Sequence, residues 1–169
     1  MKKIILIFLS FVFIAVLCAC NRTVTGYDGL VEKAREEINI SDAGTIEITI
    51  GGTTDTGRRS LVWFVTGNQY QAHEYFPMEF EITKNDNSRF KFVKAYKALD
   101  RGTDIAVCPW NEGYSFLINN ENCKMLKIIE ADGSIESIEV TVYPFVFSHE
   151  SLQGNFEYQF LDENGDEMS

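Results

Sequence analysis

Short segments that alternate between apolar and polar residues dominate the chain from Gly44 onward, and they limit the fold to one built mainly of strands. Ile46, Ile48 and Ile50 alternate with threonine and glutamate, the pattern of a strand with one buried face. Asp132-Gly133 and Asn164-Gly165 favour the tight turns that join hairpin strands. Similar turn signals recur about every 8–12 residues, a spacing typical of antiparallel sheets. The pattern predicts eight or nine strands.

One helix is predicted ahead of these strands, starting at Asp28, a residue suited to an N-cap. Leu30, Val31, Ala34 and Ile38 lie on one side of it and charged residues occupy the rest. A helix of this kind packs its apolar side on a sheet and leaves its charged side in water. The expected fold is therefore α+β and β-rich, with mainly antiparallel strands. Two arrangements stay open: a two-sheet sandwich, or a curved sheet with the helix packed on it.

These elements resemble parts of several known folds. The Asp-Gly and Asn-Gly hairpins at residues 132–133 and 164–165 resemble those of immunoglobulin-like sandwiches. The helix that precedes a sheet resembles the start of nuclear-transport-factor-2-like and cystatin-like folds. No more specific resemblance to a single family is found for residues 20–169.

The first nineteen residues have the composition of a leader rather than of a domain. Lys2 and Lys3 precede an apolar run from Ile4 to Leu17, as in a secretory signal. The run is short for a transmembrane helix, which needs about 20 apolar residues. An uncleaved anchor and an ordinary cleaved secretory signal are the two alternatives.

Leu17-Cys18-Ala19-Cys20 ends this leader and resembles the lipobox of bacterial lipoprotein precursors. The resemblance implies that a diacylglyceryl group is transferred to the Cys20 thiol and that the chain is cleaved after Ala19. Cys18 occupies a position where alanine, serine or glycine is more usual. The mature protein would then be held on the outer side of the cell membrane, facing away from the cytoplasm.

The expected organisation has three parts: a signal peptide (1–19), a lipidated tether (20–27) and one β-rich domain (28–169). Loss of Lys2 and Lys3 with the leader shifts the formal net charge from −10 to about −12. Nucleic-acid binding needs a basic surface, so nucleic acid is not an expected partner. The same charge argues against a second, polybasic contact with anionic lipids.

Two cysteines remain after the leader is removed and Cys20 is lipidated: Cys108 and Cys123. Three consecutive strands are predicted over 104–108, 114–119 and 124–129. In a simple meander the two cysteines would lie at opposite ends of the sheet, about 15 Å apart, which is too far for a disulfide. Two buried thiols are therefore expected, and a disulfide is the alternative.

The sequence contains no convergent set of catalytic residues. His73 and His149 lie far apart and have no further ligands at zinc spacing, so both are expected at the surface or a sheet edge. Ser115 follows Gly113 as in a nucleophile elbow, but it lies in a predicted meander. The Asp162–Glu167 segment departs from a calcium loop at its glycine and at its twelfth position. No catalytic residue, metal site or cofactor is predicted.

Aromatic side chains give the one signal for binding. Trp110 lies in a predicted turn, 109–113, where an aromatic ring can anchor a partner or stack on a sugar. Trp110, Tyr114 and Trp63 are the candidate ligand-binding or partner-binding residues. In the alternative interpretation, Trp110 folds back over the end of the sheet.

Three functions are compatible with these features. The first is a non-catalytic binding module that recognises a protein or glycan at the cell envelope, held to the membrane through Cys20. The second is a small-ligand carrier with an apolar pocket between helix and sheet. The third is a hydrolase that acts on an envelope substrate with a pair of carboxylates.

Overall fold

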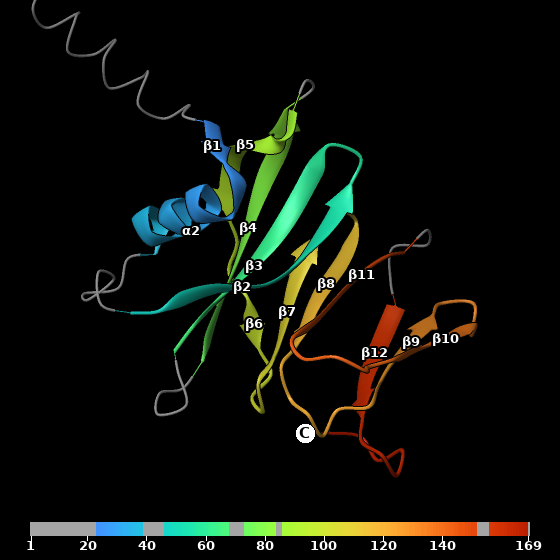
Figure 1. Ribbon diagram of the computed structural model, residues 1–169. Coiled ribbons are helices and arrows are strands. Elements are labelled where there is room, and N and C mark those ends of the chain that lie inside the picture. Colours follow the sequence, from blue (N-terminus) through green and yellow to red (C-terminus); the bar gives the residue numbers. More distant parts are fainter. Residues whose placement is uncertain (1–22, 39–45, 68–72, 84–85, 152–155, 169) are drawn as a thin grey trace, which may run out of the picture.

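The computed structural model describes residues 23–38, 46–67, 73–83, 86–151 and 156–168, and their strands form three antiparallel sheets (Figure 1). Sheet A has, in spatial order, β1 (Thr23–Thr25), β5 (Asp86–Ala95), β4 (Glu74–Thr83), β3 (Arg59–Thr66) and β2 (Ile48–Thr56). Sheet B has β11 (Phe145–Glu150), β8 (Gly113–Ile118), β7 (Ile105–Trp110) and β6 (Leu99–Asp100). Sheet C has β10 (Ile135–Glu139), β9 (Met125–Glu130) and β12 (Phe156–Leu161). The prediction of a β-rich chain with mainly antiparallel strands is confirmed.

The helix α2 (Gly26–Glu37) covers one face of sheet A. Leu30 and Ala34 are its buried residues, and they pack against Val62 and Phe64 of β3. At the border of this buried face, Lys33 Nζ lies 4.9 Å from the centre of the Phe92 ring of β5 and pairs with Glu37 at 2.6 Å. The spacing of apolar residues along the helix therefore determines which side meets the sheet.

The other face of sheet A packs on sheet B. Successive residues of a strand point to opposite faces, so Leu61 and Trp63 of β3 turn away from the helix. They lie in a second buried cluster with Ala106 of β7 and Leu117 of β8. Because β3 is covered on both faces, it carries the unbroken apolar run 61–65, as expected of an interior strand.

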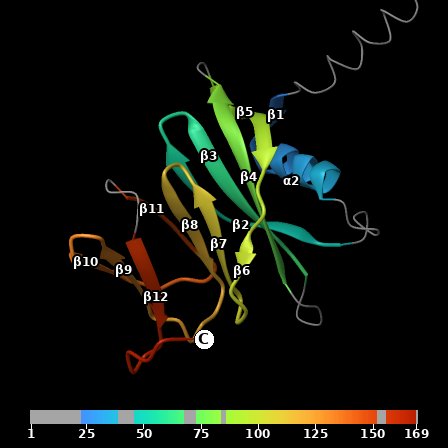
Figure 2. The same ribbon diagram turned by 180° about the vertical axis from the view of Figure 1, so that it is seen from behind.

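Sheet B is also covered on both faces, because sheet C packs on its far side. Val107 of β7 and Phe116 of β8 lie in a third buried cluster with Leu126 of β9 and Phe160 of β12. The order of layers is therefore α2, sheet A, sheet B and sheet C. Figure 2 shows α2 and sheet C on opposite sides of the molecule.

A close approach of sheets A and B depends on two glycines in β2. The register of β2 against β3 shifts between Ile50 and Gly52. A Cβ at Gly52 would lie 2.6 Å from a methyl carbon of Val146 on β11, and one at Gly51 would lie 2.9 Å from Leu117. These distances are shorter than real Cβ contacts, so the contact between the sheets has no room for a side chain at either position.

The folded domain begins earlier than the sequence indicated. Thr23–Thr25, expected within the tether, form β1 and pair with Lys91, Phe90 and Arg89 of β5. Gly26 and Tyr27 belong to α2. The polar Thr-Val-Thr segment has the alternation of a strand, but three residues are too few for the pattern to stand out. Residues 20–22 lie outside the described residues.

Both cysteines of the domain are free and buried, which confirms the expected pair of thiols. In the described part of the chain no helix is long and apolar enough to cross a membrane.

Candidate functional site

A groove of about 630 Å³ opens around the turn between β7 and β8, and we call it the Trp110 groove. It contains two of the three aromatic residues predicted from the sequence, Trp110 and Tyr114. Its lining residues are Lys94, Tyr96, Pro109, Trp110, Asn111, Glu112, Gly113, Tyr114, Ser151 and Phe156. These residues come from sheets A, B and C, so the groove runs across the end of sheet B.

The two predicted aromatic residues reach the groove from opposite faces of sheet B. Trp110 ends β7, is 4 % exposed and packs in the cluster between sheets A and B. Tyr114 is the second residue of β8, and its side chain turns toward sheet C. There its ring packs edge-on against Phe156, with 5.3 Å between the ring centres. Trp110 therefore forms the floor of the groove, and Tyr114 with Phe156 forms one wall.

Trp63, the third predicted residue, lies away from the groove. It has no exposed surface, and its indole Nε1 donates a hydrogen bond to Ser115 Oγ at 2.8 Å. This bond satisfies the one polar atom of a buried tryptophan. Trp63 and Ser115 thus contribute to the core between sheets A and B in this structure.

The turn at the rim has a backbone conformation that side chains rarely adopt. Asn111 and Glu112 connect Trp110 to Gly113, and both have positive φ, 49° and 63°. A two-residue hairpin turn with two positive φ angles favours asparagine and glycine, so Glu112 is the unfavourable residue. Strain of this type is often retained at binding sites because the surrounding structure holds it.

The turn between β7 and β8 contacts both β2 and β11. Glu150 of β11 accepts hydrogen bonds from Asn111 Nδ2 and from Thr56 Oγ1, the second at 2.9 Å. A Cβ at Gly113 would lie 1.9 Å from the backbone oxygen of His149. The rim is therefore fixed by β2 and β11 rather than free to move with its hairpin.

A buried carboxylate lies beside the groove on the side of sheet A. Glu79 of β4 has no exposed surface and accepts a hydrogen bond from the Tyr96 hydroxyl at 2.5 Å. Arg59 Nη1 lies 3.0 Å from its other oxygen. Burial, and then the bond to Glu79, raise the pKa of Tyr96 above its usual range. Tyr96 therefore stays protonated at neutral pH and serves as a hydrogen-bond donor.

Lys94 adds a positive charge to this side of the groove. Its Nζ lies 4.3 Å from the centre of the Tyr96 ring, within the range of a cation–π contact. The nearby thiol of Cys108 is buried, and burial raises its pKa to about 12. The nucleophilic form of a cysteine is the thiolate, so Cys108 is unreactive at neutral pH.

Glu130, His149 and Ser151 form a second polar cluster. The sequence did not indicate it because Glu130 ends β9, whereas His149 and Ser151 lie at the end of β11 and directly after it. His149 Nε2 lies 2.5 Å from Glu130 Oε1, and Ser151 Oγ donates to Glu130 Oε2 at 2.9 Å. His149 Nδ1 lies 3.3 Å from Glu136. Ser151 and His149 therefore both contact the carboxyl group of Glu130.

His73 also lies near a carboxylate. Its Nδ1 is 3.3 Å from Asp104 Oδ1, which accepts a hydrogen bond from the Tyr75 hydroxyl at 2.8 Å. Over the described residues, no three histidine, cysteine, aspartate or glutamate side chains are arranged to hold a metal ion. The Asp162–Glu167 segment is an exposed turn, in which Asp162 accepts hydrogen bonds from the backbone of Asn164 and Asp166.

A second cavity, of about 500 Å³, lies between α2 and sheet A. Leu30, Val62, Ile82 and Phe90 contribute apolar surface to it. Its polar lining residues are Thr53, Asp55, Arg58, Ser60 and Thr83. It is the region that corresponds to the pocket expected of a small-ligand carrier.

Comparisons with known proteins place no constraint on either site. The chain matches no protein-family model, and no significant match is found among curated proteins or solved structures.

Proposed function

We propose that the mature protein is a lipoprotein anchored through Cys20 on the outer side of the cell membrane, and that its domain is a non-catalytic binding module. The Trp110 groove is the proposed binding surface. The support for the anchor is the leader sequence, whose Leu17-Cys18-Ala19-Cys20 segment resembles a lipobox. The support for binding is the groove itself.

The observation that carries this proposal is the combination of aromatic and polar groups at one open surface. Tyr114, Phe156 and Tyr96 provide aromatic surface, and Lys94 lies beside the Tyr96 ring. Trp110 is the buried floor beneath them. Binding surfaces are enriched in tyrosine and tryptophan because a rigid ring buries much area at little entropic cost. A segment of an envelope protein or glycan with an apolar or sugar face and an anionic group would fit such a surface.

For the fold we propose a sandwich-type architecture in which sheets A and B are the two principal layers. Leu61 and Trp63 on one side and Ala106 and Leu117 on the other support it, since all four are buried in one cluster. In this arrangement the N-terminal helix and sheet C cover the outer faces of the two layers.

A small-ligand carrier is the second candidate, favoured by the cavity between α2 and sheet A. Its volume, about 500 Å³, lies within the range of small-molecule sites. Its apolar surface comes from Leu30, Val62 and Phe90, and its polar groups include Asp55 and Arg58. A ligand there would be apolar with a polar end.

Site-directed photo-crosslinking distinguishes the two functions. A photoreactive phenylalanine analogue is introduced at Glu112 on the rim of the Trp110 groove, or at Ile135, which is 58 % exposed on β10. In intact cells, a binding module gives a discrete adduct from position 112 and none from position 135. Lys94→Glu in the same protein reduces that adduct, whereas Lys127→Glu on β9 does not.

Identical adducts from both positions, or none from position 112, contradict the proposed surface. Extraction of the purified protein with organic solvent tests the carrier, which predicts a stoichiometric small molecule. Cys20→Ala tests the anchor separately, because incorporation of labelled fatty acid that persists in this variant contradicts lipidation at Cys20.

A further inference from the structure

Cationic side chains lie in rows of sheet A that run from β3 through β4 and β5 to β1, the strand that carries the chain toward Cys20. In the strand register, Arg59 of β3, Glu81 of β4 and Lys91 of β5 form one row across the sheet. Glu79 and Lys94 pair in a neighbouring row. We define the β5 basic surface by its four cationic residues: Arg58, Arg59, Arg89 and Lys91. Lys94 borders the Trp110 groove and is not counted in it.

The exposed charge of this surface is positive. Glu79 and Glu81 are the carboxylates that pair with it, and Glu79 has no exposed surface. Glu81 lies 3.4 Å from Arg58. Arg58 and Arg59 nevertheless keep 53 % and 63 % of their side chains exposed. The sequence does not reveal this surface because its residues are spread over 58–91 and only strand pairing brings them together.

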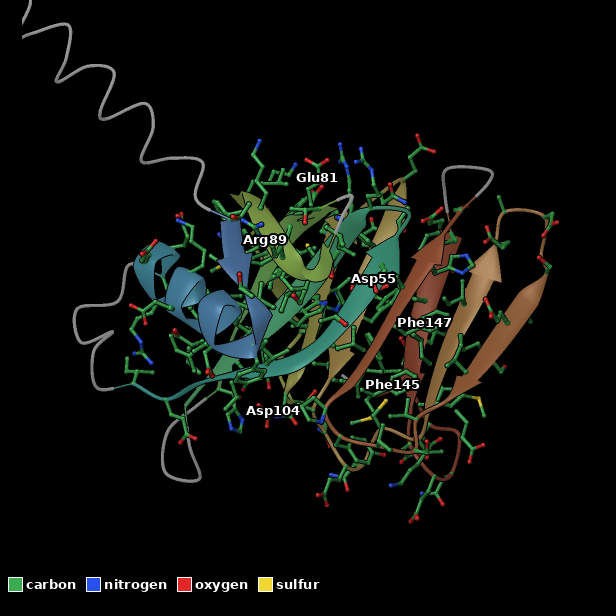
Figure 3. The ribbon with its side chains drawn as sticks, turned by 45° about the horizontal axis from the view of Figure 1, so that its top comes forward. Asp55, Glu81, Arg89, Asp104, Phe145 and Phe147 are labelled. Atoms are coloured by element: carbon green, nitrogen blue, oxygen red, sulfur yellow. The ribbon has the colours of Figure 1, made fainter. Side chains whose placement is uncertain are left out.

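The β5 basic surface lies next to the proposed anchor. Thr23 pairs with Lys91, and Arg89 Nη2 donates a hydrogen bond to Thr23 Oγ1 at 3.2 Å. Figure 3 shows Arg89 beside β1, with Glu81 nearby. Three residue steps separate Cys20 from Thr23, so the chain between them spans at most about 11 Å. A lipid on Cys20 therefore keeps β1 and the adjacent residues of β5 close to the membrane.

The end of the molecule that lies farthest from β1 is rich in acidic residues. Segments 124–139 and 156–168, which contain sheet C, hold nine acidic residues and two lysines. Sheet C lies on the far side of sheet B from β1 in both ribbon views. Charges are screened over about 8 Å at physiological ionic strength. The nine carboxylates of sheet C and its turns therefore contribute little to the electrostatic potential at the β5 basic surface.

We propose that the β5 basic surface rests on anionic lipid headgroups of the leaflet that holds the lipidated Cys20, and that it orients the domain with sheet C outward. This inference depends on the proposed lipid anchor. It reverses the expectation, drawn from net charge alone, that the domain has no second contact with lipid. Cationic side chains near an anionic leaflet are attracted to it individually, so a local surface is sufficient.

Fluorescence quenching by lipids that carry a nitroxide at the headgroup tests this orientation. Val93 of β5 is 44 % exposed and Ile135 of β10 is 58 % exposed. Each is changed to cysteine and labelled with a fluorophore in the mature, lipidated protein on vesicles. Cys108 and Cys123 have no exposed surface, so the introduced cysteine takes the label. The vesicles contain either phosphatidylglycerol or phosphatidylcholine.

The inference predicts strong quenching at position 93 on phosphatidylglycerol vesicles and at most half of it on phosphatidylcholine vesicles. Position 135 should stay unquenched on both. Arg59→Gln with Lys91→Gln should reduce quenching at position 93 on phosphatidylglycerol, whereas Lys127→Gln on β9 should not. Equal quenching at positions 93 and 135 overturns the inference. Quenching at position 93 that is the same on phosphatidylglycerol and phosphatidylcholine vesicles also overturns it.

The mass of the N-terminal peptide separates this failure from failure of the anchor. A lipidated peptide together with an unquenched label at position 93 overturns the orientation and leaves the anchor intact. An N-terminal peptide without lipid overturns both.

Discussion

Tyr96 donates its hydroxyl to Glu79, a carboxylate with no exposed surface, at 2.5 Å. The bond joins the wall of the Trp110 groove to the interior of sheet A. Glu79 also lies 3.0 Å from Arg59, so the same carboxylate connects the groove with the β5 basic surface.

Tyr96→Phe should destabilise the protein by about 1–3 kcal/mol, because it removes a donor from a buried charged group. Urea denaturation of the mature protein measures this difference. Tyr27→Phe is the control, since Tyr27 is 55 % exposed and its hydroxyl accepts one long, exposed hydrogen bond, from the Ile50 backbone at 3.4 Å. It should change the free energy of unfolding by less than about 0.5 kcal/mol. An equal cost for the two variants contradicts a supporting role for the Tyr96–Glu79 bond.

The stability of the protein should fall with rising pH above about 9. Burial raises the pKa of the Cys108 thiol from 9.0 to about 12, so the unfolded chain ionises first and binds fewer protons. This stabilisation is complete below pH 9 and is lost as pH rises toward 12. The slope that Cys108 contributes is roughly 1.4 kcal/mol per pH unit. Denaturation at several pH values in wild type and Cys108→Ala measures it, and equal slopes contradict the shift.

Gly113→Ala should disrupt the β8–β11 contact. The new Cβ would lie 1.9 Å from the His149 backbone oxygen, so the two strands must separate. Gly133→Ala is the matched control, because Gly133 has a φ of 83° but no atom within 4 Å of the added carbon. The control should cost about 1–2 kcal/mol from backbone strain alone. Thermal unfolding followed by circular dichroism compares them, and a larger loss in the control contradicts the packing.

Glu112→Gly should stabilise the fold by about 1 kcal/mol, because Glu112 has a φ of 63° and glycine adopts this conformation freely. Glu121→Gly is the control: Glu121 lies in an exposed loop and is not among the residues with positive φ, so the change should be neutral or slightly destabilising. The midpoints of urea denaturation compare the two. A lower midpoint for Glu112→Gly contradicts the assignment of strain to the rim of the groove.

Much of the fold follows from local patterns in the sequence. Asp132-Gly133 predicts a hairpin, and Ile129 does pair with Ile135 across it. The alternation around β3 also predicts a strand buried on both faces. These features depend on neighbouring residues alone, so periodicity and turn chemistry are sufficient to find them.

The candidate site could be predicted only in part. Trp110 and Tyr114, both selected from the sequence, do line one groove. Their opposite orientations depend on the register of β7 and β8, which the sequence does not give. Phe156 and Lys94 reach the same groove from sheets C and A. A local sequence pattern cannot predict a contact between residues of three different sheets. The Glu130–His149 contact was missed for the same reason.

The measurement that tests the central claim most directly is the mass of the N-terminal peptide of the protein isolated from membranes. The account predicts a peptide that begins at Cys20 and carries a diacylglyceryl group on its thiol. A peptide that begins at Met1, or an unmodified Cys20, would contradict it.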